Sequence, residues 1–167
     1  FGDAQRTGTV FEEGAWLCVM YGGVLAALGA VVYWGPKLWG RVLDDMKTLP
    51  FAGLGFIAGV LAAFPLFIAG FADQPAGEIT FSYSGPQELW NTLSLIGHLL
   101  LLVVVLAFLG YAIISFSAVD LAGDDPWDGL TLEWATTSPA PADNFADVHV
   151  IRSAEPLLDL KPSRSDA

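Results

Sequence analysis

The sequence predicts an all-α membrane protein with three transmembrane helices and an extended, irregular acidic tail. Of the 167 residues, 54% are hydrophobic and only 15% are charged, which is too apolar for a soluble domain of this length. The hydrophobic residues also gather in three uncharged runs, each longer than the ~20 residues that a helix needs to cross a bilayer. Because lipid offers the backbone no hydrogen-bond partner, helices are the expected structure of these runs.

The three runs divide the chain into seven expected segments. The runs are 21, 23 and 31 residues long, and the third exceeds what a bilayer requires, so we expect it to tilt or to emerge at one end. In chain order the expected segments are an outer N-terminal segment at 1–13, a first span at 14–34, a cytoplasmic loop at 35–49, a second span at 50–72, an outer loop at 73–88, a third span at 89–119 and a cytoplasmic tail at 120–167.

The positive charges of the two loops predict this orientation. The loop at 35–49 carries Lys37, Arg41 and Lys47, whereas the loop at 73–88 carries neither lysine nor arginine. Positively charged loops stay in the cytoplasm, so we expect a multi-pass protein of the plasma membrane with its tail inside the cell. The tail holds ten acidic and three basic residues, but acidic residues count little in this rule.

Small residues and a proline indicate that the spans pack within a larger bundle. Gly55 and Gly59 have the spacing at which membrane helices approach closely. Pro65 is expected to kink the second span and to free a carbonyl group for a neighbouring helix. The expected partners are therefore the lipid bilayer and further helices. The sequence has no clustered basic residues, which argues against a nucleic-acid partner.

The segment from Asp124 to Phe145 is predicted to form a surface strap. Its three prolines prevent a continuous helix. Trp127, Trp134 and Phe145 supply apolar anchors for a headgroup region or for a partner. The alternative is a disordered acidic tail that carries a few aromatic residues.

Few side chains are candidates for chemistry. His98 is the only ionisable group of the third span, and an ionisable residue inside a membrane is a functional candidate. The alternative is a neutral imidazole that hydrogen-bonds a neighbouring backbone carbonyl. Glu12 and Glu13 lie at the outer mouth of the first span, either as contacts for protons or cations or as solvated carboxylates. The other histidine, His149, lies in the tail, so this chain alone builds no two-histidine metal site.

The acidic turn of the tail, the single cysteine and the first residues give three further expectations. Asp124, Asp125 and Asp128 either attract a cation or form a solvated turn, since they lack the glycine and distal glutamate of a calcium loop. Cys18 is the only cysteine, so no disulfide framework is expected. The sequence starts at Phe1 without the layout of a signal peptide, from which we expect a processed or truncated product of a longer chain.

Five groups of residues, in order along the chain, together form a distinctive set. They are Tyr33-Trp34-x-Pro36-Lys37-x-x-Gly40-Arg41, then Phe64-Pro65 with Gly70, then Trp90-Asn91-Thr92-Leu93-Ser94-x-x-Gly97, then the Asp124–Phe145 run with its Leu-Glu-Trp core, and finally Ile151-Arg152-Ser153-x-x-Pro156. This set resembles the end of subunit I of the haem–copper respiratory oxidases, the cytochrome c oxidase family, and its last group resembles a terminal extension of actinobacterial members.

The resemblance implies a place for this chain in a larger protein. The three spans would be the tenth to twelfth helices of a twelve-helix bundle. The other helices of subunit I and other oxidase subunits would be its partners. In this family the assembled complex passes electrons from cytochrome c to oxygen and pumps protons.

The family's working residues are not matched. The resemblance implies a His-x-His pair on the tenth helix for the high-spin and low-spin haems, and those positions fall on Gly14 and Trp16. Glycine has no side chain, and an indole N–H offers iron no lone pair. The arginines that hold haem propionates fall on Ala76 and Gly77, and a histidine of the eleventh helix falls on Phe67. We therefore expect no catalytic, haem-binding or metal-binding residue here, with His98 as a weak candidate, and haem and copper held elsewhere in an active parent complex.

Three hypotheses for function follow. The first is a C-terminal membrane segment of an oxidase subunit I-like protein, which acts structurally within an aerobic respiratory complex. The second is a redox-silent membrane scaffold or assembly subunit derived from an oxidase. The third is a fragment of a secondary transporter, which would need polar groups at mid-membrane that the first two spans do not offer.

Overall fold

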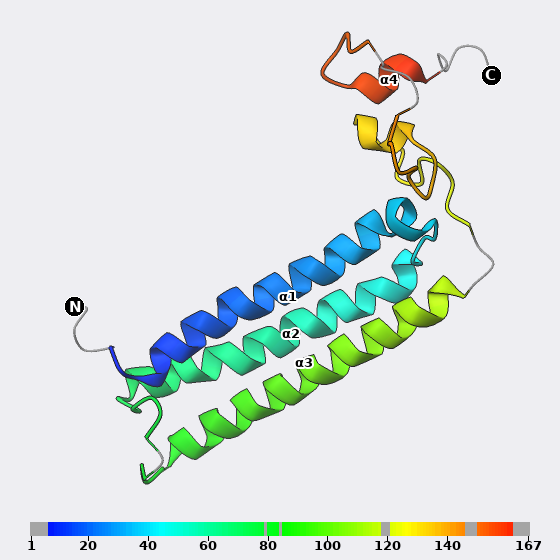
Figure 1. Ribbon diagram of the computed structural model, residues 1–167. Helices are drawn as coiled ribbons and strands as arrows, with labels where there is room; N and C mark the ends of the chain where they lie inside the picture. The colour runs from blue at the N-terminus through cyan, green and yellow to red at the C-terminus, as the bar shows by residue number, and fades with distance from the viewer. Residues whose placement is uncertain (1–6, 79, 84, 118–120, 146–149, 162–167) are drawn as a thin grey trace. The chain divides into compact units, whose positions relative to one another are not determined.

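The computed structural model describes residues 7–78, 80–83, 85–117, 121–145 and 150–161, and within these ranges the protein is helical (Figure 1). Two isolated β-bridges, Thr9 with Pro75 and Arg41 with Leu121, are the only extended pairings of the described residues. The all-α prediction is therefore confirmed. The elements are α1 at Val10–Trp39, α2 at Asp45–Phe71, α3 at Pro86–Phe116, a short 3-10 helix η2 at Leu132–Ala135 and α4 at Pro156–Leu160.

The three long helices are α1, α2 and α3, with 30, 27 and 31 residues, and each is long and apolar enough to cross a membrane. The helices α1 and α2 extend past the apolar runs into charged residues, so that only Gly40 to Asp44 separate them. Both helices include a proline near this connection, Pro36 in α1 and Pro50 in α2.

The described chain forms two compact units. The first unit comprises Phe1–Gly29 and Asp45–Tyr111, and the second comprises Ala30–Asp44 and Ala112–Ala167. Each unit has its own contacts and is described separately below.

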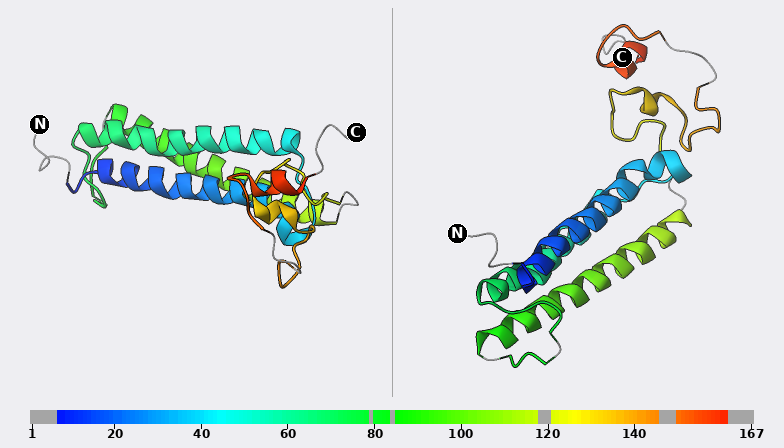
Figure 2. Two further views of the ribbon diagram at one scale, coloured as in Figure 1. Left: turned by 90° about the horizontal axis from the view of Figure 1, so that it is seen from above. Right: turned by 60° about the vertical axis from the view of Figure 1, so that its left-hand side comes forward.

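In the first unit, α2 is antiparallel to α1 and α3 (Figures 1 and 2), and its Gly55 lies close to side chains of both, Leu25 of α1 and Val104 of α3. Its buried side chains are mostly alanine, and Ala58, Ala62 and Ala69 are fully buried. Small side chains let helix backbones approach closely, which is how membrane helices gain packing energy without a hydrophobic driving force. Near the start of α2 and the end of α3, larger side chains fill the space between the helices, and the ring centroids of Phe51 and Phe108 are 5.7 Å apart.

The closest approach of α2 and α3 is at Gly97. A Cβ added there would come nearest to the backbone nitrogen of Ala62 and would lie 2.6 Å from the carbonyl carbon of Leu61. One turn earlier on α3, the Ser94 hydroxyl donates a hydrogen bond of 2.7 Å to the carbonyl of Ala62. This carbonyl lies three residues before Pro65, whereas the carbonyl that the missing N–H of Pro65 frees is that of Leu61, one residue earlier, so a donor for the freed carbonyl stays a prediction.

An amide pair closes the end of the first unit at which α1 and α3 begin. Gln74 is only 2% exposed, and it exchanges two side-chain hydrogen bonds with Asn91 of α3, at 3.0 and 2.8 Å. The backbone carbonyl of Gln74 also accepts from the N–H of Val10 at 3.1 Å. The segment after α2 is therefore bonded to the starts of both α1 and α3.

In the second unit, the end of α1 carries the tail. Gly40 ends α1 with a φ of 71°, a conformation that favours glycine, and its carbonyl accepts a hydrogen bond from the N–H of Ala122 at 3.0 Å. The rings of Trp39 and Phe116 meet edge to face at 4.7 Å. Leu43, Ala112, Trp134 and Leu157 are the buried hydrophobic residues among the described part of this unit.

Candidate functional site

Gly14 occupies the position at which the family resemblance implies a histidine for the high-spin haem. Gly14 is buried, and a Cβ added there would lie 3.0 Å from the carbonyl oxygen of Ala63 and 3.2 Å from the ring of Phe67. An imidazole would need far more room than a single carbon atom. Gly14 is thus a packing contact of α1 with α2, and the site does not fit a haem ligand on this side of α1.

The second implied position, Trp16, lies on the open side of α1 and is 68% exposed. Its indole nitrogen carries a hydrogen and has no lone pair for a metal. The residues at both implied positions therefore do not fit haem iron. Phe67, at the implied position of a further histidine, packs its ring against that of Phe11 at 4.9 Å, which is an apolar contact.

His98 is half-buried on α3 and has a defined hydrogen bond. Its Nδ1 lies 2.6 Å from the carbonyl oxygen of Ser94, four residues earlier on the same helix. A carbonyl only accepts, so Nδ1 carries the hydrogen of this bond. The ring also meets Tyr21 of α1 edge to face at 5.6 Å. This geometry matches the carbonyl-bonded alternative at Nδ1.

Trp16 and His98 line one groove between α1 and α3, which we call the α1–α3 groove. Its volume is about 560 Å³, and one residue of α2 contributes to its floor. The groove is lined by Glu13, Trp16, Leu17, Leu66, Asn91, Ser94, Leu95 and His98.

The other candidates from the sequence are not brought together. The carboxylate of Glu12 accepts a hydrogen bond from the N–H of Gly8 at 3.4 Å, at the start of α1. Ala76 stands at an implied position of a propionate-binding arginine. Its backbone N–H donates to the carbonyl of Gly8 at 2.8 Å, so the backbone of this residue bonds the loop to the segment before α1. His149 lies outside the described residues. Among the described residues, no group of three or more His, Cys, Asp and Glu side chains has the arrangement of a metal site.

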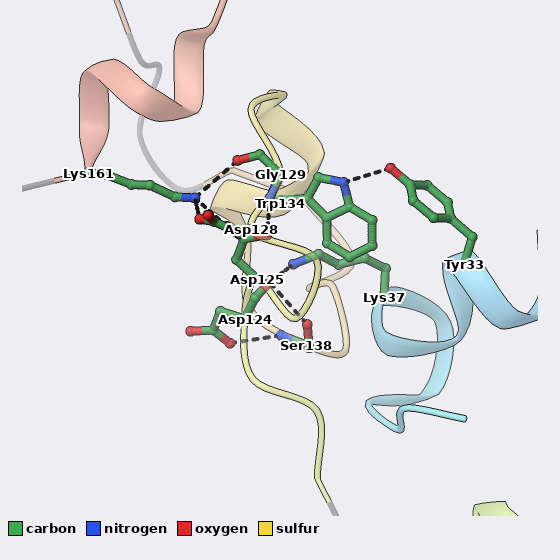
Figure 3. Close-up of polar contacts among 9 residues, drawn as sticks. All are labelled: Tyr33, Lys37, Asp124, Asp125, Asp128, Gly129, Trp134, Ser138 and Lys161. Atoms are coloured by element: carbon green, nitrogen blue, oxygen red, sulfur yellow. Dashed lines mark hydrogen bonds and ion pairs between the residues drawn. The ribbon is translucent and has the colours of Figure 1, made fainter. Parts of the chain in front are cut away.

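In the second unit, Lys37 organises the tail (Figure 3). Its side chain is 7% exposed, and its ammonium donates to the backbone carbonyls of Asp124 at 2.7 Å, Thr136 at 2.5 Å and Thr137 at 3.5 Å. The ammonium also lies 5.3 Å from the ring centroid of Trp134, at a distance typical of a cation–π interaction. One side chain near the end of α1 thus holds two separate stretches of the tail.

Aromatic residues of α1 complete this anchor. Trp134 is 1% exposed, stacks on Trp34 at 5.9 Å and donates its indole N–H to the hydroxyl of Tyr33 at 3.1 Å. Trp127 stacks on Tyr33 and donates to its backbone carbonyl at 3.0 Å. The tryptophans expected to anchor the strap do so against the end of α1 in the same chain.

The acidic turn of the tail binds a lysine of the same chain (Figure 3). The ammonium of Lys161 lies 2.7 Å from a carboxylate oxygen of Asp125 and 2.6 Å from one of Asp128, and it donates to the carbonyl of Gly129 at 3.1 Å. Asp124 instead accepts from the N–H of Ser138 at 3.1 Å. The cation at this turn is therefore an ammonium group, and it holds the segment of α4 against the strap.

Raising the pH is expected to release Lys161 from the acidic turn. Hydrogen bonds to Asp125 and then Asp128 raise the pKa of Lys161 above its ordinary value of 10.5. A raised pKa means that the docked state holds the proton more tightly, so this contribution is full below pH 10.5 and is lost as the pH rises through the raised pKa. Hydrogen exchange at the N–H of Lys161, which donates to Leu157, should quicken in that range. In Lys161→Gln the step should be absent, and a step of equal size in that variant would contradict this assignment.

Lys37 is the functional side chain that the sequence pattern did not single out. The positive-inside rule used it only as a charge in a loop, whereas the structure places it in the last turn of α1. Its partners are 87 to 100 residues away in the sequence. The available signal was the spacing Tyr33-Trp34-x-x-Lys37, which puts the two aromatic rings one turn before the ammonium on one helix.

Comparison with known proteins identifies several relatives of this chain. No family model matches it. Subunit 1 of the cytochrome c oxidase of Alkalihalophilus pseudofirmus is 32% identical over 144 residues, which are 84% of this chain and 23% of that protein. Subunit 1 of the cytochrome c oxidase of Bacillus subtilis is 33% identical over 158 residues, or 93% of this chain and 25% of that protein.

A third relative, a probable cytochrome c oxidase subunit 1-beta of Nocardia farcinica, is 32% identical over 161 residues, which are 95% of this chain and 27% of that protein. The chain thus spans about a quarter of the length of the relatives that it matches. The resemblance inferred from the residue groups is confirmed by these relatives and by three helices of membrane-spanning length. The chain is homologous, over most of its length, to a membrane segment of subunit 1 of the haem–copper respiratory oxidases.

Proposed function

We propose that this chain is the C-terminal membrane segment of a respiratory oxidase subunit 1 and that it acts structurally, without ligating haem or copper itself. In this role α1 to α3 complete the helix bundle of the subunit. Haem and copper are held by other parts of the complex. Electron transfer to oxygen and proton pumping belong to that assembled complex.

The observation that carries the structural role is the packing of Gly14. The implied histidine position faces the backbone of α2, with the carbonyl of Ala63 at 3.0 Å from a virtual Cβ. The two implied haem-ligand positions fall on Gly14 and Trp16, and a further implied histidine falls on Phe67, and none of these residues offers iron a lone pair. A segment that has exchanged ligands for packing contacts is suited to hold neighbouring helices in place.

We further propose that the tail faces the cytoplasm at the plasma membrane. Lys37 and Arg41 lie at the end of α1 that carries the tail, and Lys47 lies at the start of α2. Positive charge at this end favours the cytoplasmic side. The tail, with its charged and exposed residues such as Arg152, would there be presented to other oxidase subunits.

Purification with its partner subunits in mild detergent tests the structural role. The reduced complex should show a haem absorbance band, and Trp16→Phe and His98→Phe should leave its intensity per complex unchanged, because neither side chain holds the iron. If the complex assembles but has no haem band, the redox-silent scaffold is the correct alternative. If either substitution abolishes the band while the subunits still co-purify, a haem ligand lies in this chain and the proposal is wrong.

A further inference from the structure

The carboxylate of Asp125 takes part in two separate contacts of the tail (Figure 3). One oxygen accepts a hydrogen bond from the N–H of Gly129 at 2.8 Å, and the other lies 2.7 Å from the ammonium of Lys161. The side chain of Asp125 is only 17% exposed, so water and salt screen its charge weakly. This carboxylate therefore joins the terminal segment at 150–161 to the turn of the strap.

Gly129 connects this turn to the aromatic anchor of the strap. A Cβ added at Gly129 would lie 2.9 Å from Cγ and 3.1 Å from Nε1 of Trp134, so the backbone of Gly129 packs directly on the indole ring. Trp134 in turn stacks on Trp34 of α1 at 5.9 Å. A continuous series of contacts thus runs from the carboxylate of Asp125 to the end of α1.

Two ammonium groups from opposite sides of the strap hold neighbouring residues of the same turn. Lys37 of α1 donates to the backbone carbonyl of Asp124 at 2.7 Å, and Lys161 lies at the same distance from the carboxylate of Asp125. Fixing a residue in one conformation has an entropic cost, and a residue whose neighbour is already fixed has less freedom left to lose. Each lysine therefore makes the binding of the other more favourable.

The terminal segment gains its order from docking on the strap. Besides Lys161, it is held by Leu157, which is 6% exposed and whose N–H donates to the carbonyl of Leu130 at 3.0 Å. Its helix α4 has five residues, a length at which an isolated helix is not stable in water. We propose that this segment is a latch: while Lys161 is seated on Asp125 the strap is held more tightly against the end of α1, and release of Lys161 loosens it.

Hydrogen exchange of the purified full chain in detergent tests this coupling at an amide outside the latch. The N–H of Ala140 donates to the carbonyl of Lys37 at 2.9 Å, so its exchange reports whether the strap lies on α1. Lys161→Gln should quicken exchange at the N–H of Leu157, within the latch, and should also quicken exchange at Ala140 about fivefold, since coupling between two docking events is commonly of this size. Lys161→Arg keeps the charge and should keep both rates near those of the parent chain.

Asp125→Asn tests the route of the coupling, because asparagine keeps an acceptor for Gly129 but has no charge for the ammonium. In this background Lys161→Gln should have no further effect at Ala140. Arg152→Gln is the matched control, since it removes an equal charge from an exposed residue of the same segment, and it should leave both rates unchanged.

Three results would overturn the proposal. An unchanged rate at Ala140 in Lys161→Gln would show that the segment and the strap dock independently. An equal acceleration by Lys161→Gln with and without Asp125→Asn would exclude Asp125 as the link. An acceleration shared by the N–H of Val10, which donates to Gln74 in the first unit, would assign the effect to the whole chain and not to the latch.

Discussion

Replacing Lys37 with methionine is expected to detach the strap from the end of α1. The substitution keeps an unbranched side chain, one heavy atom shorter, but removes the donor for the carbonyls of Asp124, Thr136 and Thr137. A carbonyl that stays buried without a donor destabilises the docked strap, and a hydrogen bond to a charged group contributes about 1.5–3 kcal/mol to stability. The cation–π contact with Trp134 is lost as well. We expect docking of the strap to weaken by about 3 kcal/mol, or roughly 100-fold.

Limited proteolysis measures this effect directly. Cleavage between residues 121 and 145 should be about 100-fold faster in Lys37→Met, because the rate follows the population of the detached tail when opening is fast. Arg152→Met is the control, since it removes one positive charge from an exposed residue of the tail. Equal cleavage of both variants would show that net charge, and not the carbonyl contacts of Lys37, holds the strap.

Replacing Gly97 with alanine is expected to destabilise the first unit. The new Cβ would lie 2.6 Å from the carbonyl carbon of Leu61, which is backbone and has no rotamer by which to move away. The two helices must therefore separate, which weakens the hydrogen bond from Ser94 to Ala62. Overpacking of this kind costs about 1–3 kcal/mol, and we expect the upper end of that range because the three nearest atoms all belong to the backbone of α2.

Gly110→Ala is the matched control on the same helix, because a Cβ added at Gly110 meets nothing within 4 Å. Unfolding in detergent mixed with increasing dodecyl sulfate gives the free energy of unfolding of each variant. The control should be as stable as the parent chain or slightly more stable, since alanine favours a helix over glycine. If both variants lost the same stability, the effect would come from helix propensity and not from the contact of α2 with α3.

The class of fold was predictable from the sequence because it depends on local composition. A run of 21 to 31 uncharged residues is helical in a membrane whatever its neighbours are. The ends of the helices were less predictable. Hydropathy marks where charges begin, whereas α1 continues to Trp39 and includes Lys37, whose ammonium has partners in the tail. Such partners are far away in the sequence and leave no local pattern.

The candidate site, like the fold, could be predicted from the sequence only in part. The chemistry of Gly14 and Trp16 could be judged from residue type alone, since neither glycine nor indole offers a lone pair to iron. The close approach of Gly14 to Ala63 and Phe67 required coordinates. For His98, the sequence left a functional and a structural role open, and only the 2.6 Å contact with Ser94 assigns the hydrogen to Nδ1.

The strap illustrates how an interpretation can name the right residues without their partner. Trp127 and Trp134 were expected to contact headgroups or another protein, as tryptophans near a membrane commonly do. In the structure Trp134 is 1% exposed against Tyr33 and Trp34 of the same chain. An aromatic pair at the end of α1 and two tryptophans about 100 residues later form one cluster. Periodicity within either segment does not reveal this pairing.

The haem content of the purified chain tests the central claim most directly. The chain is incubated with an excess of haem in detergent, separated from free haem and assayed by its pyridine haemochrome spectrum, with Trp16→His alongside as a variant that regains one implied ligand. We predict that the parent chain retains no stoichiometric haem and shows no shifted Soret band. Retention of one haem per chain, lost on substitution of a residue of α1 or α3, would contradict the account.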